Sequence, residues 1–279
     1  MKKGINLYAV PGKFSLDEGF AMISKAGFDG VELNMEANKR EDGQLSLHYN
    51  CTDAELKEIK ELAKKHNLKI TSFVTGLLWQ YPLTSSDAGI REKGKDAVKK
   101  LIDYAEFFGS DTVLVVPGQV NESTYYDVAY ENALTAIKEL KPYAEEKKVA
   151  IGVENVWNKF LLSPLEMRDF IDKVDSDYVG AYFDIGNVVV NGFPEQWIKI
   201  LGKRIKKLHA KGFKTSVGNI TGFVNLLEGD INWKKVMEET KNIGYDDFII
   251  AELGSYPGFP MNLLYETSYA FNSIFKINE

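Results

Sequence analysis

Short apolar runs alternate along this chain with longer stretches in which apolar side chains recur every three or four positions. The short runs are rich in β-branched residues, as is typical of buried strands, whereas the longer stretches have the periodicity of amphipathic helices. The expected strands cover residues 4–10, 30–34, 68–75, 112–116, 149–153, 179–183, 205–208 and 248–251. Their spacing of about 25 to 45 residues is the length of one strand–helix unit with its loops.

Helix start and stop signals lie between these strands. Ser15 and Ser163 each precede a helical repeat and have a Glu three residues later, which is the arrangement of a capping box. Gly109 and Gly244 follow the last apolar position of two other repeats, as is typical of glycine at a helix end. Strict alternation of apolar strands with helices predicts a parallel sheet, and eight such units predict that the sheet closes. We therefore expect an α/β fold, a single (β/α)8 TIM barrel domain over residues 1–279.

An open, doubly wound sheet is the alternative architecture for such an alternation. That fold would need a glycine-rich fingerprint after the first strand, and the sequence Ala-Val-Pro-Gly-Lys at residues 9–13 does not supply it. No linker, block of charge or low-complexity tract offers a place at which to divide the chain.

Four successive expected strands each stop at a residue that can bind a metal ion. These residues are Glu154, Asp184, His209 and Glu252. Because a parallel barrel brings the carboxyl ends of its strands to one rim, we expect the four side chains to converge there. Three carboxylates at one place repel one another, and a divalent cation bound by oxygen and imidazole ligands removes that repulsion. The pattern therefore predicts a metal site at the rim.

Composition narrows the class of protein. A net charge of −6 and a pI near 5.3 argue against a nucleic acid partner, because proteins that bind nucleic acids usually carry a basic patch. The chain has one cysteine, Cys51, which excludes an intramolecular disulfide and fits a reducing compartment. No apolar stretch is long enough for a signal peptide or a membrane span. We expect a cytoplasmic protein without a membrane partner, and the sequence leaves a homo-oligomer open.

The chain resembles the xylose isomerase-like barrel superfamily, within its sugar-phosphate isomerase and epimerase branch, and in particular the ketose 3-epimerases. The likeness rests on residues 30–33, 152–155, 183–187, 209–211, 227–230 and 251–253. The resemblance implies that Glu154, Asp184, His209 and Glu252 hold one divalent ion, and that Glu154 and Glu252 are the catalytic acid and base. The ligand types favour manganese, cobalt or magnesium, with zinc as an acceptable substitute.

Two positions depart from the ketose 3-epimerases that the chain resembles. Asn187 stands where those enzymes place a substrate-binding His, and Thr215 stands where they place an Arg. Gly212 also replaces an Asp that is common in relatives after the His-x-Lys stretch. These differences leave the metal ligands intact but weaken the transfer of any particular sugar specificity.

The expected chemistry is removal of a proton next to a ketone carbonyl. A divalent cation stabilises the enediolate that results, and two carboxyl groups on opposite faces of it allow epimerisation. We therefore predict an epimerase or isomerase of a sugar or of a sugar phosphate, in carbohydrate metabolism. Residues expected to bind this small-molecule substrate, from their positions after strand ends, are Glu32, Asn187, Lys211 and Trp157. A structural ion pair is the alternative for Glu32, and a packing role is the alternative for Lys211 and for Trp157.

Other functions on the same fold stay open at this point. An inosose dehydratase or a hydroxypyruvate isomerase would use the same ligands. A non-catalytic sugar-binding barrel would be indicated by a missing ligand, which the sequence does not show. An apurinic endonuclease needs many histidines for its zinc ions, and three histidines in an acidic chain argue against it.

Overall fold

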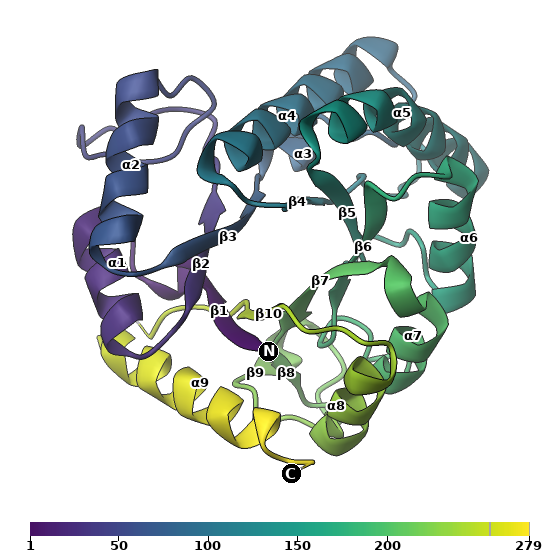
Figure 1. Ribbon diagram of the computed structural model, residues 1–279. Coiled ribbons are helices and arrows are strands. Elements are labelled where there is room, and N and C mark those ends of the chain that lie inside the picture. The colour runs from purple at the N-terminus through teal and green to yellow at the C-terminus, as the bar shows by residue number, and fades with distance from the viewer. Residues whose placement is uncertain (257, 279) are drawn as a thin grey trace.

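Eight parallel strands form a closed barrel in the computed structural model, which describes residues 1–256 and 258–278 (Figure 1). They are β1 (Lys2–Asn6), β2 (Gly30–Asn34), β3 (Lys69–Val74), β4 (Thr112–Val115), β5 (Ala150–Glu154), β6 (Val179–Asp184), β7 (Ile205–Ala210) and β10 (Phe248–Ala251). The barrel closes because β1 pairs in parallel with both β2 and β10. The predicted (β/α)8 fold class is confirmed, and the open sheet is excluded.

Helices cover the outside of the barrel (Figure 1). They are α1 (Leu16–Lys25), α2 (Asp53–Lys65), α3 (Leu77–Gln80), α4 (Ala88–Phe108), α5 (Tyr126–Lys147), α6 (Pro164–Val174), α7 (Pro194–Leu201), α8 (Trp233–Asn242) and α9 (Pro260–Phe275). The capping box at Ser15 is formed with Glu18, and Ser163 accepts a hydrogen bond from the backbone of Glu166. None of the helices described is long and apolar enough to cross a membrane.

The alternation of side chains along each strand decides what enters the barrel. On β7, Lys207 and His209 point inward, whereas Leu208 packs outward into the layer between strands and helices. Lys207 is 1% exposed and binds Asp111 and Asp247 near the amino-terminal end of the barrel. His209 lies two residues further along β7, at the carboxyl end of the barrel. The same strand therefore carries a structural ion pair near one end of the barrel and a candidate ligand at the rim.

The first expected strand, residues 4–10, is too long. The strand β1 ends at Asn6, whose side-chain oxygen accepts a hydrogen bond from the backbone N–H of Tyr8 at 2.8 Å and starts a short 3-10 helix, Leu7–Ala9. An Asn side chain can compete with the sheet for backbone groups in this way. As a result the Tyr8 side chain is half exposed at the rim.

The loops after strands contain structure that the hydrophobic pattern did not predict. The expected loop 76–87 includes α3, and the expected loop 212–229 contains a small antiparallel sheet of β8 (Gly212–Phe213) and β9 (Phe223–Val224). Gly229 is required here, because a Cβ atom at this position would lie 2.4 Å from the backbone nitrogen of Phe213. This small sheet places the Phe223 ring beside the carboxyl end of the barrel.

Candidate metal and catalytic site

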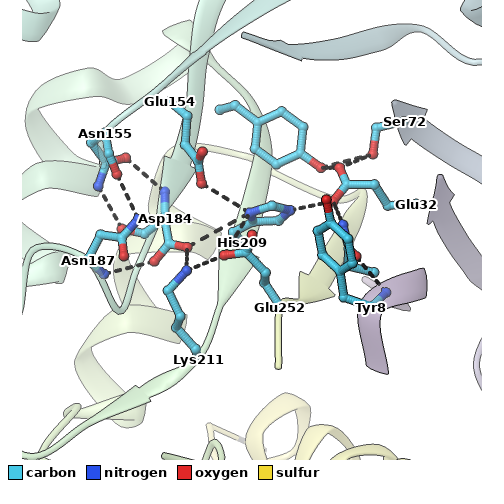
Figure 2. Close-up of polar contacts among 12 residues, drawn as sticks. Tyr8, Glu32, Ser72, Glu154, Asn155, Asp184, Asn187, His209, Lys211 and Glu252 are labelled. Carbon is cyan, nitrogen blue, oxygen red and sulfur yellow. Dashed lines mark hydrogen bonds and ion pairs between the residues drawn. The ribbon is translucent and has the colours of Figure 1, made fainter. Parts of the chain in front are cut away.

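The four side chains that follow strand ends do converge at the rim (Figure 2). Glu154, Asp184, His209 and Glu252 each offer one ligand atom, and these atoms all lie within 4.8 Å of one another. Three of the residues are the last or next-to-last of their strands, and Glu252 directly follows β10. Asp184 and His209 are fully buried, whereas the side chain of Glu252 is 31% exposed toward solvent.

The His209 ring nitrogen Nδ1 faces three carboxylates. It lies 3.2 Å from Glu154 Oε1, 3.8 Å from Asp184 Oδ2 and 3.9 Å from Glu252 Oε2. In the view of Figure 2, Glu154 lies above and Glu252 below the Nδ1 edge of the imidazole, and both carboxylates face that nitrogen. Carboxylate oxygens and one imidazole nitrogen form a donor set that suits a divalent cation.

The electrostatics of this cluster also favour a cation. Burial, together with the charges of Glu252 and Asp184, raises the pKa of Glu154 to about 7. The buried Asp184 Oδ2 accepts no hydrogen bond of good geometry, although the Lys211 ammonium lies 2.7 Å away. Lys211 also contacts Glu252. Burial alone would raise the pKa of Glu252, but Lys211 and His209 outweigh it and lower that pKa. The residues present therefore fit a divalent ion.

Asn155 and Asn187 fix the orientation of Asp184. The Asn155 side chain accepts a hydrogen bond from the Asp184 N–H at 2.8 Å and donates one to the Asp184 carbonyl at 2.9 Å. The backbone N–H of Asn187 donates to Asp184 Oδ1 at 2.8 Å, and its side-chain amide donates to the Asn155 carbonyl. These contacts engage Oδ1 and leave Oδ2 directed at the centre of the cluster. We did not predict that Asn155 orients Asp184. The only signal in the sequence was its position directly after Glu154.

Glu32 lies beneath the site and not in the cavity. Its side chain is fully buried, and Oε1 lies 2.8 Å from His209 Nε2 and accepts a hydrogen bond from Asn6. Oε2 accepts hydrogen bonds from Ser72 at 2.7 Å and from the Tyr182 hydroxyl at 2.5 Å. We expected Glu32 either to bind substrate or to form a structural ion pair. In this structure its oxygens are engaged, it does not line the cavity, and it pairs with His209, as the second expectation holds.

The charge of Glu32 matters for the imidazole. Burial alone would raise the pKa of Glu32, but His209 and the hydrogen bonds from Tyr182 and Asn6 outweigh it and lower the pKa to about 2. Burial alone would lower the pKa of His209, yet Glu32 and Glu154 hold that pKa well above its ordinary value. A carboxylate at Nε2 fixes the tautomer and the tilt of a metal-binding histidine. Nδ1 is therefore the nitrogen available to a metal ion.

We expect Glu32→Gln to weaken divalent metal binding by about 10- to 100-fold, because the amide removes the charge that orients His209 and raises its basicity. Isothermal titration calorimetry with Mn²⁺ measures the affinity. Tyr182→Phe is the matched control, since it removes one hydrogen bond to Glu32 but keeps the carboxylate, and its effect should be smaller. An unchanged affinity in Glu32→Gln would show that the contact with His209 has no positioning role.

A cavity of about 580 Å³ opens above the four candidate ligands. Glu154, Glu252, Asn187 and Lys211 provide polar groups at its base, so Asn187 and Lys211 lie where substrate binding was expected. The remaining wall is largely aromatic and aliphatic. It includes Tyr8, Trp79, Trp157, Ile220, Phe223 and Leu253.

Trp157 is held in this wall by contacts at both ends. Its indole N–H donates to the Asn187 carbonyl at 2.7 Å, and its ring packs against Phe223 with centroids 5.0 Å apart. Tyr8 belongs to the opposite part of the wall and was missed, because we expected a strand to continue through it. Burial and the charges of Glu36 and Glu252 raise the pKa of Tyr8 to about 12, so its hydroxyl stays protonated.

A family model described as xylose isomerase-like TIM barrel matches residues 20–271. An uncharacterised protein of Methanocaldococcus jannaschii is 26% identical over 85% of this chain and 79% of that protein. The L-ribulose-5-phosphate 3-epimerase UlaE of Escherichia coli is 22% identical over 90% of this chain and 87% of the enzyme.

Solved structures agree with the family match in fold. A D-tagatose 3-epimerase-like protein has a TM-score of 0.81 at 22% identity, covering 99% of this chain and 98% of its own. An L-ribulose 3-epimerase has a TM-score of 0.78 at 17% identity, covering 99% of this chain and 95% of its own. Likeness at such identities shows a shared fold.

Proposed function

This chain belongs to the xylose isomerase-like TIM barrel family, and from that premise we propose that it is a divalent-metal-dependent epimerase or isomerase of a sugar or sugar phosphate. The observation that carries the proposal is the convergence of Glu154, Asp184, His209 and Glu252, two of which, Glu154 and Glu252, line one cavity. Relatives and structural neighbours named as ketose 3-epimerases support the same reaction class.

The two glutamates are proposed to move protons on opposite faces of the substrate. Glu154 ends β5 and Glu252 follows β10, and the strands β6 and β7 separate them in the barrel. One carboxylate removes the proton next to the substrate carbonyl, and the other, already protonated, returns a proton to the opposite face. A bound divalent cation supplies Lewis-acid stabilisation of the negative charge that develops on the substrate oxygens. If the proton returns to the neighbouring carbon instead, the reaction is an isomerisation.

The cavity wall is proposed to hold the sugar so that its reacting carbon lies between the Glu154 and Glu252 carboxyl groups. Trp157 and Phe223 present aromatic faces, on which the CH groups of a sugar can stack. Lys211 lies beside Asp184 and Glu252, where its ammonium can donate a hydrogen bond to a substrate oxygen. The Asn187 amide is engaged with Asn155, so it contributes mainly by holding the wall in place.

The proposed cofactor is one manganese, cobalt or magnesium ion, and zinc is an acceptable substitute, because carboxylates dominate the donor set. A panel of ketoses and ketose phosphates, incubated with Mn²⁺ and scored for epimers and aldoses, tests the function. We expect at least one substrate to give an epimer or an aldose. Loss of water from an inosose without epimer formation would favour a dehydratase. Binding of a sugar without any product would favour a sugar-binding barrel.

A further inference from the structure

We propose that His48, Cys51 and Glu55 form a second metal site, of the zinc class, away from the barrel rim. The three residues lie at the junction between the loop after β2 and the first turn of α2, on the outside of the barrel (Figure 1). One ligand atom from each lies within 4.8 Å of the other two. The reaction proposed for the rim uses none of them.

The imidazole of His48 provides an independent reason for a ligand here. Its side chain is only 7% exposed, and its Nε2 atom is buried without any hydrogen-bond partner. This nitrogen lies 3.7 Å from Glu55 Oε2, so it points into the cluster. Buried polar atoms are nearly always hydrogen-bonded, and an exception calls for an explanation such as an ion. Among the described residues, two further unpartnered buried atoms, on Gln44 and Ser46, lie in the same loop.

The backbone holds the cluster in shape before any ion binds. The backbone N–H of His48 donates to Cys51 Sγ at 3.2 Å, and the backbone N–H of Cys51 donates to the Tyr104 hydroxyl at 3.2 Å. The Tyr104 hydroxyl donates in turn to the His48 carbonyl at 2.9 Å. Tyr104 belongs to α4, so a residue from a different part of the fold fixes the distance between the imidazole and the thiol.

Glu55 is shared between the cluster and the start of α2. Its Oε1 accepts a hydrogen bond from Lys39 at 2.8 Å, while Oε2 accepts hydrogen bonds from Thr52 and faces His48. The side chain of Lys39 is 53% exposed, so its ammonium group can turn away from Glu55 into solvent when a metal ion binds. Since Glu55 has these other partners, the imidazole and the thiolate supply most of the binding.

The donor types set the chemical class of the ion. A thiolate and an imidazole with one carboxylate suit zinc, which takes four ligands and can accept water as the fourth. A metal ion binds cysteine as the thiolate, so metal binding at Cys51 releases the thiol proton. The rim cluster has carboxylates and no sulfur, so manganese, cobalt or magnesium suits it better than zinc. A bound zinc would join the loop to α2 and stiffen the cavity of about 700 Å³ that the loop lines next to Tyr8.

Cobalt spectroscopy and cysteine labelling test the site in the full chain. In the Asp184→Asn background, which disables the rim cluster, we expect one equivalent of Co²⁺ to give the near-ultraviolet absorption of a cobalt–thiolate bond. Cys51 is the only cysteine, so reaction with a thiol reagent reports on it alone. Zinc should slow this reaction by about tenfold or more, because a metal-bound thiolate is a poor nucleophile.

Cys51→Ser and His48→Gln, each in the same background, should abolish the absorption band and the second site. His66→Gln is the matched control, because the His66 Nε2 already has a partner, Asp17, at 2.6 Å, and it should keep the band. The single variant Cys51→Ser should still bind one Mn²⁺ at the rim, which shows that it folds. The proposal would be overturned if the Asp184→Asn protein gave no cobalt–thiolate band, or if zinc did not change the rate at which Cys51 is labelled.

Discussion

Glu154→Gln and Glu252→Gln should each lower turnover by about 10²- to 10⁴-fold, the contribution that is typical of a general acid or base. Each change keeps an oxygen in the ligand set and nearly the same volume, but the amide is a weaker ligand than the carboxylate. Turnover is therefore compared at a Mn²⁺ concentration that saturates each variant, so that the remaining loss reports on proton transfer. Epimer formation in the presence of Mn²⁺ measures it. Glu228→Gln is the matched control, since Glu228 is exposed and lies on a loop beside the rim.

Solvent deuterium exchange separates the two glutamates. The variant that keeps the base for a given epimer should still exchange the substrate's α-hydrogen without inverting the centre, and the other variant should show neither exchange nor inversion. Their behaviour should swap when the opposite epimer is supplied. Equal exchange by both variants from both epimers would mean that one base serves both faces, and the mechanism with two carboxylates would be wrong.

Asp184→Asn should reduce Mn²⁺ affinity by more than about 100-fold. Residues that only support a metal ligand typically contribute up to about that factor, and Asp184 is proposed to be a ligand itself. Asp184 is fully buried, and its Oδ2 is directed at the centre of the cluster without a hydrogen bond. Asparagine keeps the shape but removes the charge, and its amide offers a poorer ligand. Elemental analysis of purified protein, together with calorimetric titration, measures the change.

Asp177→Asn is the control for this substitution, because Asp177 is exposed and lies at the other end of the barrel, among the residues around Lys148 and Asp246. It should leave Mn²⁺ binding unchanged. Ligand binding stabilises a folded protein, so Mn²⁺ should raise the melting temperature of the parent and of Asp177→Asn but not of Asp184→Asn. Stoichiometric manganese in Asp184→Asn would contradict the assignment of the ligands.

The fold and the ligand cluster were predictable because both follow from local pattern and topology. Each candidate ligand stands where an apolar run stops, and parallel strands bring those points together. No contact between distant residues had to be known. The same reasoning identified Trp157 and Lys211 as residues near the cavity, since each follows a candidate ligand, Glu154 or His209, by two or three positions.

The partners of Glu32 were not predictable, although an ion pair was one of two expectations, because they depend on how β2 is aligned with its neighbour. The pairing of β2 with β3 shifts register between Val31 and Glu32, and this shift sets Glu32 beside Ser72. A register shift leaves no trace in hydrophobic periodicity. Tyr8 was missed for a related reason, since the Asn6 side chain ends β1 by a local hydrogen bond that an apolar run conceals.

Glu32 and His209 are 177 positions apart in the chain, so the ribosome makes Glu32 long before the histidine that it contacts. The second half of the chain carries all four candidate ligands of the rim site, but Glu32 in the first half contacts the imidazole of one of them. A fragment that contained only the second half would have the donors without their orientation, and would bind cations weakly and with little discrimination. Glu252 follows β10, which pairs with β1, so the proposed rim site is complete only after the last strand has joined the first. We therefore expect the finished barrel, and not the growing chain, to bind the divalent ion.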